Sequence, residues 1–99
     1  AEPWTQDENW LQQAYTAHSE FEAFSKPVTV GEGVNLSEVF SWLDKNLPAD
    51  AIMCNGAGNY AAWLHRFYRH KAFKTQLAPT SGAMGYGFPA ALAAKAVYP

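Results

Sequence analysis

Two glycine-rich turns, each between a short apolar run and a helical pattern, constrain the fold of this 99-residue chain most strongly. The apolar run 51–54 predicts a buried strand, and a turn at 55–59 and a helix at 60–69 should follow it. The helix is expected to direct its apolar side chains inward: Tyr60, Trp63, Leu64, Phe67 and Tyr68. A second strand is expected at 73–77, before a glycine-containing segment at 80–89 that leads into an alanine-rich helix. This order predicts an α/β fold with a partial parallel sheet and flanking helices. Ligands of such sheets bind beyond the carboxyl ends of the strands, where both turns lie.

The first half of the chain predicts two helices. After a loose lead-in at 1–6, a helix is expected from Asp7 to Phe24, capped by Thr5 with Glu8 or by Asp7 itself. Its apolar side chains recur at spacings of three and four, which places them on one face: Trp10, Ala14, Ala17, Phe21 and Phe24. A second helix should begin at Asn35 or Ser37 and end before Pro48, because Asn35 and Glu38 match a capping box with Asn35 as the cap. Its apolar stripe is Leu36, Val39, Phe40, Leu43 and Leu47.

Charge is divided unevenly along the chain. All nine carboxylates lie in residues 1–50 with two lysines, which gives −7, whereas residues 51–99 carry five cations and no carboxylate, which gives +5. A half without carboxylates suits an anionic ligand. An uneven division by chance is the alternative, because salt screens such patterns.

The first turn could bind phosphate. Its glycines allow a tight turn, and the helix that follows directs unpaired N–H groups back at it. The turn has Gly-x-Gly without the third glycine of a dinucleotide fingerprint, so a plain turn is the alternative.

The second segment surrounds Met84 with Gly82, Gly85 and Gly87. Such a backbone can touch a ligand directly, and the flexible Met84 side chain could lie against a flat ring. The alternative is a glycine loop that feeds a closely packed helix, with Met84 filling the core.

Other sites are less supported by the sequence. Residues 63–71 are basic and aromatic, but the chain is acidic overall, so a solvated helix face is favoured over nucleic-acid binding. No spacing indicates a metal site, and no nucleophilic Ser, His and acid set is evident. The lone Cys54 fits a small buried hydrophobe in a reducing cytoplasm, and no run of 18 apolar residues could span a membrane.

The two turns with their surroundings, 47–59 and 80–91, resemble the diphosphate-binding domain of thiamine diphosphate (ThDP) enzymes. The resemblance is to the acetolactate synthase and benzoylformate decarboxylase-like branch, and it covers residues 35–99. It implies that 35–99 form the first part of a three-layer ThDP-binding domain and that 1–34 are a connecting segment with one helix. Both ends of the chain are expected to be cuts in a longer protein.

The resemblance also assigns roles. Backbone N–H groups of Gly58, Asn59 and Tyr60 would bind the cofactor diphosphate, although relatives often carry Gln and His at the last two positions. The Gly82 carbonyl and the Met84 N–H would bind the aminopyrimidine, with Ala83 between them, and the Met84 side chain would hold the cofactor in its bent form.

The resemblance further implies a 2-keto acid carboligase or decarboxylase that uses ThDP and Mg²⁺ and assembles as a homodimer or tetramer. The Mg²⁺ ligands and the activating glutamate are expected outside residues 1–99, so the 99-residue chain should hold no catalytic or metal-binding residue and should be inactive alone. A small helical structural or interaction module without a cofactor is the alternative, and another nucleotide-phosphate binder is a third possibility.

Overall fold

The computed structural model describes Thr5 and residues 7–99. In this part of the chain the elements follow the order α1 (Glu8–Phe24), α2 (Leu36–Asn46), β1 (Met53–Cys54), α3 (Ala61–Phe67), β2 (Gln76–Leu77) and α4 (Gly87–Val97). The expected alternation of strands and helices after residue 50 is therefore confirmed. The loose lead-in expected at 1–6 lies, apart from Thr5, outside the described residues.

The two strands form a parallel pair, with Met53 opposite Gln76 and Cys54 opposite Leu77. The Asn55 N–H extends the ladder by donating to the Leu77 carbonyl over 3.0 Å. The second strand is shorter than the predicted 73–77, because a turn precedes it in which Lys74 has a φ of +61°. Pairing in the sheet therefore starts only after this turn.

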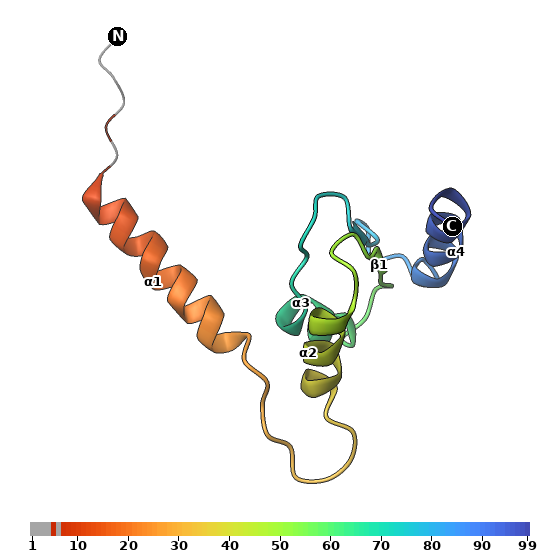
Figure 1. The fold of residues 1–99 in the computed structure, drawn as a ribbon, viewed down its shortest axis with the longest axis horizontal. Coiled ribbons are helices and arrows are strands. Elements are labelled where there is room, and N and C mark those ends of the chain that lie inside the picture. The colour runs from red at the N-terminus through yellow and green to blue at the C-terminus, as the bar shows by residue number, and fades with distance from the viewer. Residues whose placement is uncertain (1–4, 6) are drawn as a thin grey trace.

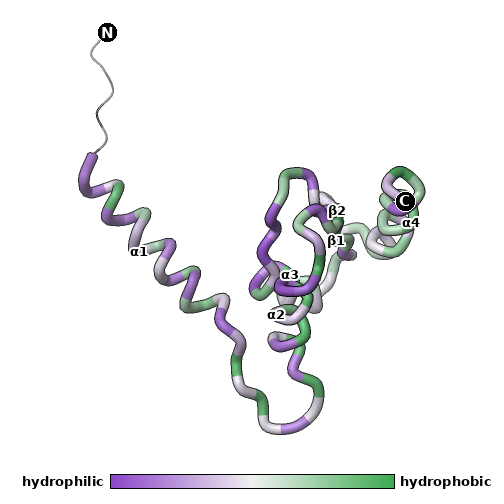
Figure 2. Tube along the Cα trace, viewed as in Figure 1, coloured by the Kyte–Doolittle hydropathy of each residue, from purple (hydrophilic) through white to green (hydrophobic). Residues whose placement is uncertain are grey.

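The two strands are the middle one of three layers. Figure 1 shows α2 and α3 on one side of β1 and β2, and α4 on the other. Helix α4 packs against both strands, and α2 packs against α3. Figure 2 shows that α4 is largely hydrophobic around its circumference, yet the described structure buries no residue of this helix. An α/β fragment with helices on both faces of a partial parallel sheet is thus what the sequence forms.

The start of α2 is fastened to the preceding loop. The Asn35 side chain caps the helix by accepting from the Ser37 N–H over 3.1 Å, as predicted from the capping pattern. Ser37 is completely buried, and its hydroxyl oxygen accepts from the Val28 N–H over 3.0 Å. The Asn35 amide donates to the Val28 carbonyl over 2.8 Å, so these two polar side chains hold the loop before α2 in place.

Helix α3 supplies most of the core. Ala61, Leu64 and Phe67 are buried, together with Tyr68 directly after the helix. The helix is shorter than the predicted 60–69, because Tyr68 is already extended with φ −105° and ψ 133°. The prediction that Tyr60 points inward is wrong, since its side chain is 60% exposed.

Helix α1 lies apart from this unit as an arm, as Figure 1 shows. Asp7 caps it by accepting from the Asn9 N–H over 2.8 Å, so the second of the two predicted caps is the one used. The predicted apolar stripe exists but covers no core, because no residue of α1 is buried and Trp10 remains 59% exposed. The arm accounts for a radius of gyration of 17.4 Å, against about 13 Å for a compact domain of this length.

A close backbone contact joins the start of α4 to the turn after β1. A Cβ atom added to Gly87 would lie 2.8 Å from the Gly56 nitrogen and 2.9 Å from the Asn55 carbonyl carbon. Both neighbours are backbone atoms, which cannot rotate away as a side chain can. Glycine at 87 is therefore what allows α4 to begin directly beside the first turn.

We expect Gly87→Ala to lower the free energy of unfolding by about 1–3 kcal/mol, the usual cost of overpacking. Gly31→Ala is the matched control, because no atom lies within 4 Å of a Cβ at that position. The control should change stability by less than about 0.5 kcal/mol. Urea denaturation followed by circular dichroism measures both, and equal midpoints for the two variants would contradict the tight contact.

Candidate functional site

The first glycine turn follows β1 directly and runs into α3. Asn55 and Gly56 are buried at its start, whereas Gly58 and Asn59 are exposed. In the described part of the chain, the N–H groups of Gly58, Asn59 and Tyr60 donate no backbone or side-chain hydrogen bond. These three donors, predicted as ligands of a diphosphate, are therefore free to bind an anion.

The Tyr60 ring folds back over this turn. A Cβ atom added to Gly58 would lie 2.6 Å and 2.8 Å from the Cε1 and Cδ1 atoms of Tyr60, and one added to Gly56 would meet the Tyr60 hydroxyl. Glycine at 56 and 58 thus makes room for the ring as well as allowing the turn. This packing role favours the alternative given above for this segment, a plain turn whose glycines are required for packing.

The second glycine segment has a different character. Gly82 and Gly85 have φ values of +68° and +79°, in the region that favours glycine, and a Cβ at either position would meet nothing within 4 Å. Between them the Met84 side chain is 90% exposed. The prediction that the Met84 side chain would fill the core, given above as the alternative, is therefore wrong.

An open hollow lies beside Met84. Its walls come from Leu77 at the end of β2, from the loop and from one side of α4: Ala83, Met84, Gly85, Tyr86, Pro89, Ala90 and Ala93. A second hollow lies over the first turn, between residues 55–59, the start of α3 and the segment after β2. Both are found where β1 and β2 end, as expected for a parallel sheet.

The two predicted segments meet through Gly87, which follows the second segment's Met84 by three residues and touches the first turn at Gly56. Sequence reasoning placed Gly87 in the motif but assigned it no role. The signal that could have identified it is its position at the start of a helix, where glycine is a poor choice unless another backbone comes close.

The cations of residues 51–99 do not surround these hollows. Arg69 forms an ion pair with Glu22 over 2.7 Å, and this contact lowers the pKa of the Glu22 carboxyl, mainly through the hydrogen bond from Arg69. Lys71 pairs with Asp44 over 3.7 Å. The Arg66 Nε–H donates to the Phe24 carbonyl over 2.8 Å, and its guanidinium lies 3.9 Å from the centre of the Phe24 ring.

These contacts change the interpretation of two sequence features. Arg66, Arg69 and Lys71 contact residues of the acidic half, and no lysine or arginine lines either hollow, so these cations do not mark an anion site at the glycine segments. The basic pattern at 63–71 is not a solvated helix face either, because α3 ends at Phe67 and both arginines contact α1.

A chain of polar side chains that the sequence did not indicate lies under the first turn. The Asn55 amide donates to the Gly56 carbonyl over 3.1 Å, and the Gln76 amide lies 3.3 Å from the Asn55 Oδ1 atom. The same Gln76 nitrogen is 3.2 Å from the His65 Nε2 atom. These residues are separated by 21 and 11 positions in the sequence, so no local spacing could have found them.

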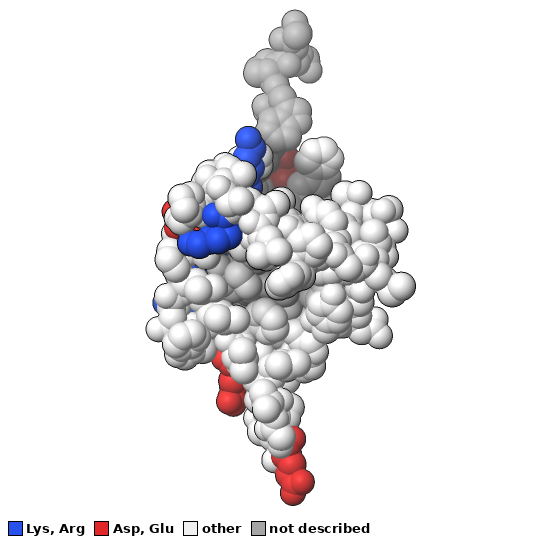
Figure 3. Space-filling model, turned by 90° about the vertical axis from the view of Figure 1, so that its right-hand side faces the viewer, with Lys and Arg blue, Asp and Glu red and all other residues white. Residues whose placement is uncertain are grey.

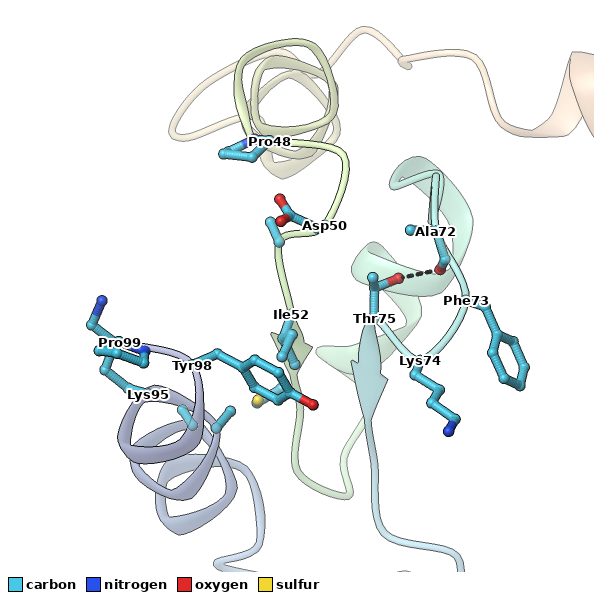
Figure 4. A pocket seen from close by; sticks show the side chains of 14 residues that line it. Pro48, Asp50, Ile52, Ala72, Phe73, Lys74, Thr75, Lys95, Tyr98 and Pro99 are labelled. Carbon is cyan, nitrogen blue, oxygen red and sulfur yellow. Dashed lines mark hydrogen bonds between the residues drawn. The ribbon is translucent and has the colours of Figure 1, made fainter.

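The largest of the three hollows, of about 720 Å³, lies away from both glycine segments. Figure 4 shows it between the residues that precede β1 and β2 and the end of α4, with the Tyr98 ring beside Ile52. The side chains of Lys74 and Lys95 also line it. It lies near the amino ends of the strands, where parallel sheets do not usually bind ligands, so its size does not make it the functional site.

No group of three or more potential metal ligands occurs among His, Cys, Asp and Glu of the described residues. Within the described residues, Thr5 and 7–99, no helix is long and apolar enough to cross a membrane.

Comparison with known proteins agrees with this geometry. Residues 56–99, which include both glycine segments, match the family described as thiamine pyrophosphate enzyme, C-terminal TPP binding domain. Over 72 residues, 72% of this chain, the sequence is 32% identical to acetolactate synthase 3, chloroplastic, of Brassica napus. It is 33% identical over the same length to acetolactate synthase, chloroplastic, of Arabidopsis thaliana, and 32% identical to acetolactate synthase 1, chloroplastic, of Oryza sativa subsp. japonica.

The fold and the matched residues support a fragment of a ThDP-binding domain, similar to thiamine pyrophosphate enzymes over residues 56–99 and to acetolactate synthases over 72 residues. The aligned part spans 11% of the length of each of these relatives. No solved structure matches the chain. The resemblance identified from the sequence is thus confirmed at the level of the family.

Cys54 offers a test of the strand environment. Burial raises the pKa of its thiol, so the reactive thiolate is scarcer in the folded chain than in the unfolded one at the same pH. We expect iodoacetamide at pH 8 to alkylate Cys54 several-fold more slowly in buffer than in 8 M urea. Mass spectrometry of the Cys54 peptide over time measures the two rates, and equal rates would show that the thiol is not shielded by the sheet.

Proposed function

We propose that residues 55–60 and 82–87 together bind ThDP in a 2-keto acid carboligase or decarboxylase of the acetolactate synthase type. The observation that carries this proposal is the contact between Gly87 and Gly56, which brings both segments to the same end of the parallel sheet. In terms of organisation, we propose that 35–99 open the ThDP-binding domain and that 1–34 connect it to the rest of the protein.

The first turn suits the diphosphate. The free N–H groups of Gly58, Asn59 and Tyr60 lie before α3, where the partial positive charge of a helix start favours anions. The Tyr60 ring over the turn is 60% exposed, so it can rotate away at little packing cost. The residues present therefore fit a diphosphate bound through the backbone.

The second segment suits the aminopyrimidine. Residues 82–85 are exposed, so the peptide groups between Gly82 and Gly85 are accessible, and the apolar hollow beside Met84 is open to a flat ring. We assign the Gly82 carbonyl as acceptor for the amino group and the Met84 N–H as donor to a ring nitrogen, with Ala83 between them. The Met84 side chain, which contacts little in the protein, is available to support the bend of the cofactor.

Bound ThDP would supply the carbanion chemistry that removes CO₂ from a 2-keto acid, while the protein orients it. We further propose that Mg²⁺ neutralises the diphosphate, because no lysine or arginine lines the hollow over the first turn. The metal ligands and the catalytic groups are proposed to lie outside residues 1–99, so this chain alone should be inactive.

For partners we propose a homodimer or tetramer. Helix α4 is apolar around its circumference, which is typical of a buried helix, yet Phe88 is 77% and Leu92 58% exposed. Figure 3 views the molecule from the α4 side and shows a broad face with few charged groups. For the compartment we propose the reducing cytoplasm on the basis of the lone Cys54, whereas the relatives named above are chloroplastic.

A module whose glycines serve packing alone is the competing function, since Gly56, Gly58 and Gly87 all have neighbours that require glycine. The two proposals differ at Met84, which is 90% exposed and fills no core in the described residues. The positive φ of Gly82 and Gly85 accounts for glycine there under either proposal.

Isothermal titration of the full-length protein with ThDP and Mg²⁺ separates these functions. We expect saturable binding, and we expect Met84→Ala to raise the dissociation constant about tenfold, because burial of such a side chain contributes about 1.5–3 kcal/mol. Val34→Ala is the matched control, an exposed apolar residue of the loop before α2 that lines neither hollow, and should bind as the wild type does. Absence of binding by the wild type would support the packing module.

A further inference from the structure

The hollow over the first turn has a single titratable side chain in its wall, that of His65. The remaining wall consists of Ala, Gly, Asn and Pro residues: Asn55, Gly56, Ala57, Gly58, Asn59, Ala61, Ala62, Ala78 and Pro79. Arg66, Arg69 and Lys71 are held by contacts with α1 and α2. Besides backbone N–H groups and the amides of Asn55 and Asn59, His65 is thus the protein group available to a diphosphate there.

The orientation of the polar chain under the turn follows from one fixed atom. The Gly56 carbonyl oxygen can only accept, so the Asn55 atom 3.1 Å from it must be the amide nitrogen. The other Asn55 atom is then an oxygen, which requires the Gln76 nitrogen 3.3 Å away to donate to it.

The same reasoning fixes the state of His65. The Gln76 amide nitrogen has two hydrogens, one for Asn55 and one for the His65 Nε2 atom at 3.2 Å. Since an amide nitrogen accepts no hydrogen bond, the Nε2 atom must be the acceptor and carry no hydrogen. His65 is therefore held as the neutral tautomer with its hydrogen on Nδ1, which leaves one ring N–H as a donor.

We propose that His65, oriented by Asn55 and Gln76, is a side-chain ligand of the cofactor diphosphate and that its Nδ1–H makes this contact. The inference rests on the proposed function, because it requires ThDP on the first turn. In this arrangement Gln76 is a positioning residue: it connects the ligand His65 to Asn55, and through Asn55 to the Gly56 carbonyl of the same turn.

The test uses two ligands that differ only in the diphosphate. Thiamine and ThDP are titrated by isothermal calorimetry into the full-length protein with Mg²⁺, as wild type and as His65→Leu and His65→Gln. We expect His65→Leu to weaken ThDP binding at least about tenfold, as for a lost hydrogen bond to a charged group, and to leave thiamine binding unchanged. His65→Gln should restore most of the affinity, because its amide can accept from Gln76 and donate to phosphate.

Two further variants separate positioning from general stability. Gln76→Met should weaken ThDP binding less than His65→Leu, without changing thiamine binding. His18→Leu, on the α1 arm, is the histidine control and should bind both ligands as the wild type does. In the ligand-free protein labelled with ¹⁵N-histidine, the His65 signal, assigned by its loss in His65→Gln, should show hydrogen on Nδ1, and Gln76→Met should remove that preference.

The possible results distinguish the two proposals. If the wild type binds ThDP and His65→Leu binds it equally well, the role of His65 is overturned and the proposed function stands. Equal weakening of thiamine and ThDP would also overturn it, because the effect would then come from a disturbed fold. If the wild type binds no ThDP, both proposals fail together.

Discussion

The contact between Gly87 and the Asn55–Gly56 peptide is the constraint on which the rest of the site depends. The sheet has two strands of two residues each in the described part of the chain, which is too little to fix a helix by itself. Because Gly87 has no side chain, α4 can begin against the backbone of the first turn while it packs on β1 and β2. The second glycine segment ends at this contact, so its place relative to the first is set there.

Electrostatics has a structural role in this chain. Three of the five cations that follow residue 50, namely Arg66, Arg69 and Lys71, contact carboxylates, a carbonyl group or aromatic rings that precede it. Each of these exposed pairs adds little to the free energy of unfolding. Their main effect is therefore on the orientation of the α1 arm. In the site proposed above, backbone N–H groups, a metal ion and His65 would together bind the diphosphate, with the backbone as the main ligand.

The elements were predictable from the sequence where a local pattern determines them. The cap at Asn35, the helix at 8–24 and the order of strands and turns after residue 50 all follow from spacing and turn chemistry. The end of α3 and the start of β2 were not predictable from the sequence. Tyr68 is packed in the core in an extended conformation, and Lys74 adopts a positive φ; each of these conformations depends on tertiary contacts. The site was predictable as two glycine segments, and the family comparison confirms the resemblance they carry. The hydrogen-bonded connection among Asn55, Gln76 and His65 was not predictable, because it joins segments that are far apart in the sequence.

A crystal structure of the full-length protein with ThDP and Mg²⁺ would show whether the two glycine segments bind one cofactor. We expect the diphosphate against the N–H groups of Gly58, Asn59 and Tyr60, and the aminopyrimidine between Gly82 and Met84, with Gly87 still in contact with Gly56. ThDP bound instead in the hollow lined by Lys74 and Lys95, or bound with the two glycine segments separated, would contradict this expectation.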